Sequence, residues 1–491
     1  MPGVLIAGTT SDAGKTVVVT GLCRALARRG IKVAPYKAQN MSNNSMVVTG
    51  PDGAGAEIGR AQWIQALAAG ATPEVAMNPV LLKPGSDRLS HVVLMGRPAG
   101  ELSSSDWEAR RRMLAVAAHA AYADLAARYD IVIAEGAGSP TEINLRAGDY
   151  VNMGLARRAG LPTVVVGDVD RGGVFAAFFG TVALLSAEDQ ALVAGFIVNK
   201  FRGRQKLLEP GLRDLERLAG RRIFGTLPWH PDLWLDSEDS LDLDGRRSPR
   251  TGARRVAVIR LPRLSNFTDV DALGLEPELD VVFVADPRGV GGADLVVLPG
   301  TRATIADLTW LRSRGLDRAV LDHAAAGKPV LGLCGGFQML GRTILDPDHV
   351  EGAVGQAAGL GLLDVETRFA TTKVLRLPSG TGLAAPAFGY EVHHGRITRG
   401  DGVEEFLGGA RAGQIFGTMW HGAFEGDALR AAFLAETLGL VPSAVSFPAA
   451  RERRLDLLAD LIEQHVDVAA ILHLINAGVP QDLPFLPPGA P

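Results

Sequence analysis

The sequence predicts an α/β protein with two domains, the first built around a mostly parallel sheet and the second a further α/β unit. Short apolar runs that indicate buried strands alternate with helical patterns through residues 1–231 and again from residue 255. At 491 residues the chain is too long for a single hydrophobic core. Residues 232–254, acidic first and then rich in Gly, Arg, Ser and Pro, have the composition of a linker. We therefore expect domains at residues 1–231 and 255–445, with a C-terminal helix and tail at 446–491.

Composition argues against several classes of protein. The net charge is −4 and there is no basic stripe with interleaved aromatic residues, which argues against a nucleic-acid partner. Cys23 and Cys334 are too few for a disulfide framework, and this indicates a reducing compartment. The first residues turn into a glycine loop at once, unlike a signal peptide, and no apolar run reaches membrane-spanning length. We expect a cytoplasmic protein without membrane insertion.

A glycine-rich loop between a strand and a helix is the first candidate site. The strand covers residues 4–7, the loop runs from Gly8 to Thr16, and the helical pattern follows. In such a loop backbone N–H groups cradle phosphates, Lys15 reaches the terminal phosphates, and the Thr16 hydroxyl ligates Mg²⁺. The five residues between Gly8 and Gly14 give a spacing that resembles dethiobiotin synthetase and its relatives. This pattern predicts an ATP site made of Thr10, Ser11, Asp12, Ala13, Gly14, Lys15 and Thr16.

Polar residues also follow later strands of this domain, at the sheet edge where ligands bind in α/β folds. Glu135 ends a strand and is suited to hold Mg²⁺ beside a phosphate loop. Lys37 follows the second strand and either stabilises a transferring phosphoryl group or faces solvent. Asn199 follows a late strand and, by resemblance to related phosphate-loop enzymes, reads the nucleotide base, unless it lies in a plain surface turn. Asp149 is expected to contact substrate or metal, on its position in the motif alone.

The second candidate site is a cysteine in a sharp strand-to-helix turn. Val330–Leu333 is an apolar run typical of a buried parallel strand, and a helical pattern begins soon after Cys334. A thiol at a helix N-terminus is favoured as thiolate, the nucleophilic form. Gly332, Gly335 and Gly336 provide the room that such an elbow needs. An arbitrary cysteine is usually a buried structural residue, as we expect for Cys23, but the Gly-x-Cys-Gly-Gly context favours a nucleophile.

The run Gly-Leu-Cys-Gly-Gly-Phe-Gln at 332–338 resembles the elbow of class I glutamine amidotransferases, which release ammonia from glutamine through a thioester. We expect His421 to be the base partner of Cys334, with His394 as the histidine to test next. Enzymes of this class usually carry a Glu two residues after the catalytic His, where this chain has Ala423. The group that orients His421 is therefore not identified from the sequence.

An oxyanion hole near the cysteine should consist of two backbone N–H groups. Gly300 or Thr301 follows one strand and Gly335 follows the next, so their N–H groups can converge on one point.

The chain as a whole, from residue 3 to about 475, resembles the cobyric acid synthase family, glutamine-dependent amidotransferases of cobalamin biosynthesis. The resemblance rests on runs in a fixed order: Ser11-Asp-Ala-Gly-Lys-Thr, Lys37-Ala-Gln-Asn-Met, Met77-Asn-Pro-Val-Leu-Leu-Lys-Pro, Glu135-Gly-Ala-Gly-Ser-Pro, Asp170-Arg-Gly-Gly-Val-Phe, Asn199-Lys-Phe-Arg-Gly, Arg263-Leu-Ser-Asn-Phe-Thr-Asp, Leu298-Pro-Gly-Thr and the Cys334 elbow. It implies ATP- and Mg²⁺-dependent amidation of the b, d, e and g carboxylates of adenosylcobyrinic acid a,c-diamide. Acyl phosphates would be the intermediates, and glutamine would supply the ammonia.

Two other functions compete with the one that this resemblance implies. A sibling enzyme amidates the a and c carboxylates, but the run Lys37-Ala-Gln-Asn-Met favours cobyric acid synthase. A partitioning-type ATPase usually has an extra lysine early in the phosphate loop, where this chain has Thr9 and Thr10. At the end of the chain we expect one long amphipathic helix over residues 455–475 and a loose tail over 484–491.

Overall fold

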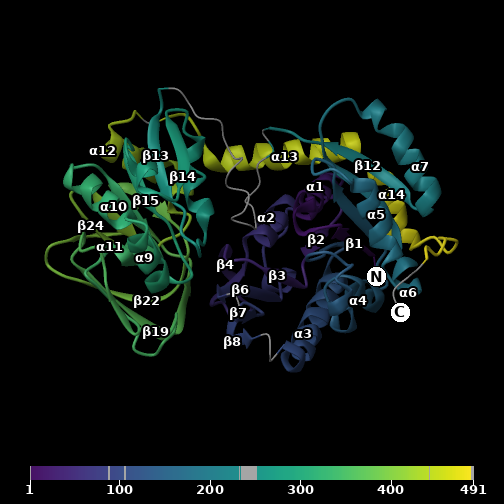
Figure 1. The fold of residues 1–491 in the computed structure, drawn as a ribbon, viewed down its shortest axis with the longest axis horizontal. Helices are drawn as coiled ribbons and strands as arrows, with labels where there is room; N and C mark the ends of the chain where they lie inside the picture. The colour runs from purple at the N-terminus through teal and green to yellow at the C-terminus, as the bar shows by residue number, and fades with distance from the viewer. Residues whose placement is uncertain are drawn as a thin grey trace.

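The computed structural model describes residues 2–86, 89–103, 107–231, 233, 252–441 and 443–487. Most of the expected linker and the last four residues of the expected tail lie outside these residues. The described chain forms two α/β halves, and α13 (Phe447–His465) extends from one to the other (Figure 1). Within the described residues, no helix has both the length and the apolar character needed to cross a membrane.

Six parallel strands form the main sheet of the N-terminal half. Their order across the sheet is β12-β11-β10-β1-β9-β2. The strands are β1 (Gly3–Gly8), β2 (Val33–Tyr36), β9 (Ile131–Glu135), β10 (Thr163–Asp168), β11 (Val193–Phe201) and β12 (Arg222–Pro228). The helices are α1 (Lys15–Arg28), α2 (Arg60–Ala68), α3 (Trp107–Arg128), α4 (Met153–Ala159), α5 (Val174–Ala183), α6 (Ala187–Gln190) and α7 (Glu209–Ala219).

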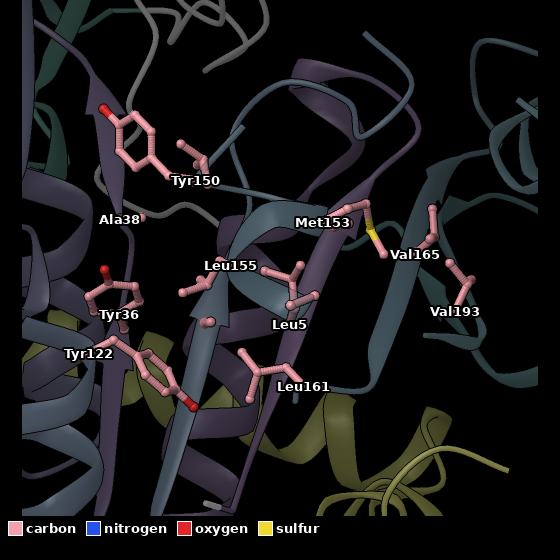
Figure 2. Packing of buried hydrophobic residues seen from close by; sticks show 14 of the residues in the cluster. Leu5, Tyr36, Ala38, Tyr122, Tyr150, Met153, Leu155, Leu161, Val165 and Val193 are labelled. Atoms are coloured by element: carbon pink, nitrogen blue, oxygen red, sulfur yellow. The ribbon is translucent and has the colours of Figure 1, made fainter. Parts of the chain in front are cut away.

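Both faces of this sheet are buried, as expected for parallel strands with helices on either side. On β1, Leu5 packs in one apolar cluster and its neighbour Val4 in another, because successive side chains of a strand point to opposite faces. Figure 2 shows the first cluster, where Leu5 lies near Leu155 of α4. In the same cluster the rings of Tyr36 and Tyr122 meet edge to face, with their centroids 5.2 Å apart.

The opposite face of the sheet is covered by α1 and by two helices from the end of the chain, α13 and α14 (Val468–Ala477). The expectation of one helix over residues 455–475 is therefore wrong. Between the two helices Val466 pairs with Gly225 of β12, and the Asp467 side chain caps α14 by accepting from the Ala470 N–H at 2.9 Å. The bridge to the sheet and the cap break the helix there.

The part of the tail within the described residues packs on the same half, rather than lying loose as expected. The Leu486 N–H donates to Gln190 at 2.8 Å, and the Pro484 carbonyl accepts from Arg221 at the same distance.

The C-terminal half contains a seven-stranded sheet in the order β14-β13-β15-β16-β25-β24-β23, parallel up to β25 and antiparallel beyond it. Its strands are β13 (Arg254–Ile259), β14 (Leu279–Val284), β15 (Leu295–Leu298), β16 (Val330–Leu333), β23 (Glu404–Phe406), β24 (Gly409–Ala412) and β25 (Ile415–Thr418). The helices are α8 (Pro287–Val290), α9 (Thr304–Ser313), α10 (Leu316–Ala325), α11 (Gly335–Leu340) and α12 (Asp427–Leu438). A second sheet has β17 (Thr343–Leu345), β18 (Gln356–Ala358), β19 (Val365–Arg376) and β22 (Glu391–Arg399), and a hairpin has β20 (Ser379–Gly382) and β21 (Ala385–Phe388).

Two small sheets of the N-terminal half face the C-terminal half (Figure 1). One contains β3 (Gln39–Met41), β6 (Val80–Ser86), β7 (Leu89–Leu94) and β8 (Arg97–Ser103), and the other is the hairpin β4 (Ser45–Thr49) and β5 (Gly55–Gly59). The hairpin packs so closely on β19 that a Cβ at Gly55 would lie 2.2 Å from the Leu375 carbonyl oxygen. Buried Arg60 and Glu425 form an ion pair of 2.6 Å across the same interface. The halves therefore share a packed interface.

We predict that Ile462→Ala destabilises the N-terminal half, although Ile462 lies far along the chain from its sheet. Ile462 is fully buried against α1, where a Cβ at Gly21 would lie 2.4 Å from its Cγ1. The cavity left by the truncation should lower the free energy of unfolding by about 2–4 kcal/mol. A urea titration, followed by hydrogen exchange of peptides from β1 and α1, measures the change. The control Val441→Ala, at a residue that is 82% exposed, should stay within about 0.5 kcal/mol of wild type. Equal stability of the two variants would contradict the packing described.

Candidate active sites

The phosphate loop joins β1 to α1. Its ammonium group, Lys15 Nζ, donates to the carbonyl oxygens of Thr10 and Ser11, at 2.9 Å each. Gly14 has a φ of 97°, a left-handed conformation that favours glycine. A Cβ at Gly8 would lie 3.0 Å from Lys15 Nζ. The loop thus folds around the lysine. Gly14 is required there by its backbone conformation, and Gly8 by the lack of space for a side chain.

Glu135 brings several expected site residues together at the end of β9. Its carboxylate is fully buried and accepts from Lys37 Nζ at 2.9 Å, from Thr16 Oγ1 at 3.0 Å and from Gln65 Nε2 at 2.5 Å. The sequence indicated Lys37, Thr16 and Glu135 separately, whereas Gln65, on α2, was missed. Of the alternatives for Lys37, solvent exposure is excluded because the side chain is buried.

The residues present fit a magnesium ion held jointly with a nucleotide. The described residues include no group of three or more His, Cys, Asp or Glu side chains arranged for a metal. Mg²⁺, however, needs only one or two protein oxygen ligands when phosphates supply others. The adjoining oxygens of Thr16 and Glu135 are such a pair.

A cavity of about 480 Å³ opens beside this cluster. Its lining includes the expected residues Ser11, Lys15, Thr16, Lys37, Glu135 and Asp149, together with Met41, Leu82, Arg111, Leu145, Arg146 and Tyr150. The cavity therefore combines the phosphate-loop end with a wall of apolar and cationic side chains.

Two residues that were expected to contact ligands, Asp149 and Asn199, form hydrogen bonds with the backbone of the protein instead. The carboxylate of Asp149 accepts the N–H groups of Val151, Asn152 and Gly154 at 2.7–2.9 Å, which fixes the loop that enters α4. Asn199 lies behind the phosphate loop, where its Nδ2 donates to the Ala13 carbonyl at 3.0 Å. Asn199 is buried, so the alternative of a plain surface turn is wrong.

The cysteine elbow has the geometry that its glycines suggested. Cys334 has a φ of 47°, a strained value for a residue with a side chain, and it stands between β16 and α11. Its N–H donates to the Thr418 carbonyl at 2.8 Å, which fixes the turn to β25. A Cβ at Gly336 would lie 2.0 Å from the Leu298 carbonyl oxygen, and one at Gly332 would lie 2.6 Å from Phe337 Cα.

His421 is held by a carboxylate that the sequence analysis did not identify. Its Nδ1 hydrogen-bonds to Asp269 Oδ2 at 2.6 Å, and Asp269 Oδ1 accepts the Gly422 N–H at 2.8 Å. The ring also stacks on Tyr390 and makes a side-chain hydrogen bond to Cys334. Burial would lower the pKa of His421, but the charges of Asp269 and Cys334 and their hydrogen bonds raise it to about 10. The His421 ring is therefore an imidazolium at neutral pH, held between the Asp269 carboxylate and the Cys334 sulfur.

Asp269 replaces the missing Glu of the amidotransferase pattern, since Ala423 is buried and carries no polar group. It lies 152 residues before the histidine. The sequence did carry a signal, because Asp269 ends the run Arg263-Leu-Ser-Asn-Phe-Thr-Asp that supported the family resemblance.

The two turns expected to form an oxyanion hole lie beside this pair. A Cβ at Gly335 would lie 3.1 Å from the Thr301 nitrogen, and one at Gly300 would lie 3.1 Å from His421 Cε1. Within the described part of the chain, neither the Thr301 nor the Gly335 N–H donates to a backbone carbonyl. Both N–H groups are thus near the cysteine and not engaged by the backbone.

A small cavity of about 40 Å³ surrounds Cys334. Its lining includes Lys83 of the N-terminal half and, from the C-terminal half, Arg302, Glu351, Lys373, His393 and His394. His394 Nδ1 donates to the Ala370 carbonyl at 3.0 Å, and burial lowers the pKa of His394 to about 4. Unlike His421, it has no carboxylate partner at hydrogen-bonding distance among the contacts described, so His421 is the better base candidate.

Comparison with known proteins assigns both halves to families. Residues 4–242 match the CobQ/CobB/MinD/ParA nucleotide binding domain, and residues 255–429 match the CobB/CobQ-like glutamine amidotransferase domain. Proteins named cobyric acid synthase from Mycolicibacterium gilvum, Mycolicibacterium vanbaalenii and Mycobacterium ulcerans are 77%, 76% and 74% identical to this chain. Each alignment covers 100% of both chains.

We predict that Asp269→Asn moves the pH dependence of Cys334 alkylation to lower pH. Because the pKa of His421 is raised to about 10, the imidazolium persists at pH 7 and is lost only as the pH rises towards that value. Loss of the Asp269 charge lowers this pKa, so Cys334 loses its cationic neighbour at a lower pH. The change in the rate of Cys334 alkylation by iodoacetamide that accompanies loss of the His421 proton should move to lower pH, by one unit for each loss of about 1.4 kcal/mol of interaction. Mass spectrometry across pH 5–10 measures it.

The matched control is Asp401→Asn, on an exposed turn, which should leave the alkylation profile unchanged. An Asp269→Asn profile that superimposes on that of wild type would contradict the role of Asp269 in raising the pKa of His421.

Proposed function

The chain belongs to the cobyric acid synthase family of glutamine-dependent amide ligases, and we propose that it amidates the b, d, e and g carboxylates of adenosylcobyrinic acid a,c-diamide with ATP and glutamine. The observation that carries this proposal is the presence of two complete but different sites in one chain. A phosphate loop with a buried acid lies in one half, and a cysteine elbow with a carboxylate-held histidine lies in the other. The names of the relatives favour this reaction over amidation of the a and c carboxylates.

In the C-terminal site Cys334 is the nucleophile. Its thiolate attacks the side-chain amide carbon of glutamine, and the resulting oxyanion is stabilised by the N–H groups of Thr301 or Gly300 and of Gly335. The His421 imidazolium gives its proton to the departing ammonia, which leaves a thioester. Water, deprotonated by His421, then hydrolyses the thioester to glutamate. Asp269 holds the ring so that its other nitrogen faces Cys334.

In the N-terminal site the chemistry starts from a carboxylate, which is a poor electrophile. ATP converts it to an acyl phosphate, and ammonia then displaces phosphate to form the amide. The loop Thr10, Ser11, Asp12, Ala13, Gly14, Lys15 and Thr16 binds the phosphates, and Lys37 neutralises charge on the transferring phosphoryl group. Thr16 and Glu135 would hold Mg²⁺, which supplies further neutralisation of phosphate charge.

The remaining two residues act less directly in this proposal. Asn199 contributes to ATP binding by supporting the loop at Ala13. Asp149 shapes the substrate side of the cavity through the backbone that it holds. An enzyme that consumes ATP and depends on a free thiol fits a cytoplasmic location.

We predict opposite defects for Cys334→Ser and Glu135→Gln. Cys334→Ser should abolish amidation from glutamine and retain amidation from ammonium chloride, because only ammonia production is lost. Glu135→Gln should abolish amidation from both sources, since the acid that orders Lys37 and Thr16 is needed to form the acyl phosphate. It should still form the thioester at Cys334. Mass spectrometry of the corrinoid products and of trapped thioester measures all four results.

With wild-type enzyme, the corrinoid product must gain four amide groups in the same assay. A Cys334→Ser enzyme that is equally inactive with ammonium would give the cysteine a wider role. Normal amidation by Glu135→Gln at low Mg²⁺ would remove Glu135 from the metal site.

A further inference from the structure

A buried cluster of charges lies in the wall of the Cys334 cavity, where the two halves meet. Lys83 of β6 and Lys373 of β19 both pair with Glu57 of β5, at 2.6 Å and 2.5 Å. Lys83 Nζ also donates to Ser45 Oγ at 3.0 Å. Glu57 is fully buried and Lys83 is 5% exposed. One carboxylate therefore serves two ammonium groups, one from each half of the protein.

The lysine cluster carries a local excess of positive charge, because Lys83 and Lys373 share the single carboxylate of Glu57. Three cationic side chains, Lys83, Lys373 and Arg302, face two carboxylates, Glu57 and Glu351. Burial works against the charge on Glu57, but the two lysines hold its pKa well below the usual range, whereas burial raises the pKa of Glu351 to about 7. A buried excess of positive charge raises the free energy of the folded protein, and a bound anion lowers it again.

Two histidines of this cavity, His393 and His394, do not add to this charge. Burial lowers the pKa values of His393 and His394, so both rings are neutral at pH 7. His421 is cationic but is paired with Asp269, so the local excess of positive charge comes from the two lysines that share Glu57.

We propose that Lys83 and Lys373 bind the α-carboxylate of glutamine while its side-chain amide lies at Cys334. The inference rests on the proposed glutaminase function of that cysteine. A substrate whose amide reaches Cys334 has a carboxylate at its other end, and Lys83 and Lys373 lie in the wall of the same cavity. Each ammonium group has three N–H donors, and the contacts of Lys83 with Ser45 and Glu57 use two of them. A substrate carboxylate accepts the third.

The size of the cavity agrees with a role for long side chains in its wall. At about 40 Å³ it holds little more than a water molecule, so the wall must move when glutamine enters. Lys83 and Lys373 have flexible stems that can swing aside and then contact the substrate. Glutamine recognition in the C-terminal half would then require a side chain from the N-terminal half.

The test compares Lys83→Met with wild type in the full-length enzyme. Hydrolysis of glutamine should show a KM raised at least tenfold, with a smaller change in kcat, because the lost contact is to a group that does not react. Alkylation of Cys334 by iodoacetamide, which has no carboxylate, should stay within threefold of wild type. Lys83→Arg, which keeps the positive charge, should recover part of the lost affinity.

Arg60→Met is the matched control. Arg60 makes a buried ion pair between the halves but does not line the cavity, so its loss disturbs the interface without removing the carboxylate contact. Any effect of Arg60→Met should change glutamine hydrolysis and iodoacetamide alkylation by the same factor.

Two results would overturn the proposal. One is a KM of Lys83→Met for glutamine within threefold of wild type. The other is a parallel fall in glutamine hydrolysis and iodoacetamide alkylation, which would mean that Lys83 only supports the fold. If wild-type enzyme released no ammonia from glutamine, the glutaminase function itself would fail, and this outcome is distinguishable from both.

Discussion

Strand β6 is the constraint on which the arrangement of the two sites depends, because it forms part of the wall of both cavities. Leu82 lines the cavity beside the phosphate loop, and its neighbour Lys83 lines the cavity around Cys334. Successive side chains of a strand point to opposite faces, so one strand can contribute side chains to two different cavities. Strand β6 pairs with β3 on one side and with β7 on the other, which fixes its register. The family reaction needs such proximity, since ammonia made at one site is consumed at the other.

The two halves are held on either side of this strand by contacts between distant parts of the chain. Arg60 pairs with Glu425, Lys373 pairs with Glu57, and α13 crosses from the C-terminal half to complete the core of the N-terminal half (Figure 1). Removal of one partner from a buried ion pair lowers the stability of the folded protein, because the other charge is left buried and unpaired. This favours a fixed relation between the halves, in which movement at the glutamine cavity is limited to side chains such as Lys83.

Local patterns allowed much of the fold and both sites to be predicted from the sequence. The phosphate loop, the strand that ends at Glu135 and the Cys334 elbow are each set by residues within one short segment, and the structure contains each of them. Roles that depend on distant partners could not be predicted in this way. Asp269 is separated from His421 by 152 residues, and Glu57 from Lys373 by 316. No local periodicity connects such pairs. The break between α13 and α14 was missed for a related reason, since Gly225, far away in the sequence, pairs with Val466 there.

The central claim is that ammonia released at one site passes directly to the other, because the two sites share a wall. An experiment with isotope-labelled glutamine nitrogen tests it. The enzyme is supplied with ATP, corrinoid substrate, glutamine labelled with ¹⁵N in its amide group, and an equal concentration of unlabelled ammonium chloride. Mass spectrometry then gives the ¹⁵N content of the new amide groups and of the ammonium in solution. Direct transfer between adjacent sites predicts amide groups that are far richer in ¹⁵N than the dissolved ammonium. Amide groups with the same ¹⁵N fraction as the dissolved ammonium would contradict it, because the ammonia would then have mixed with solvent before it reacted.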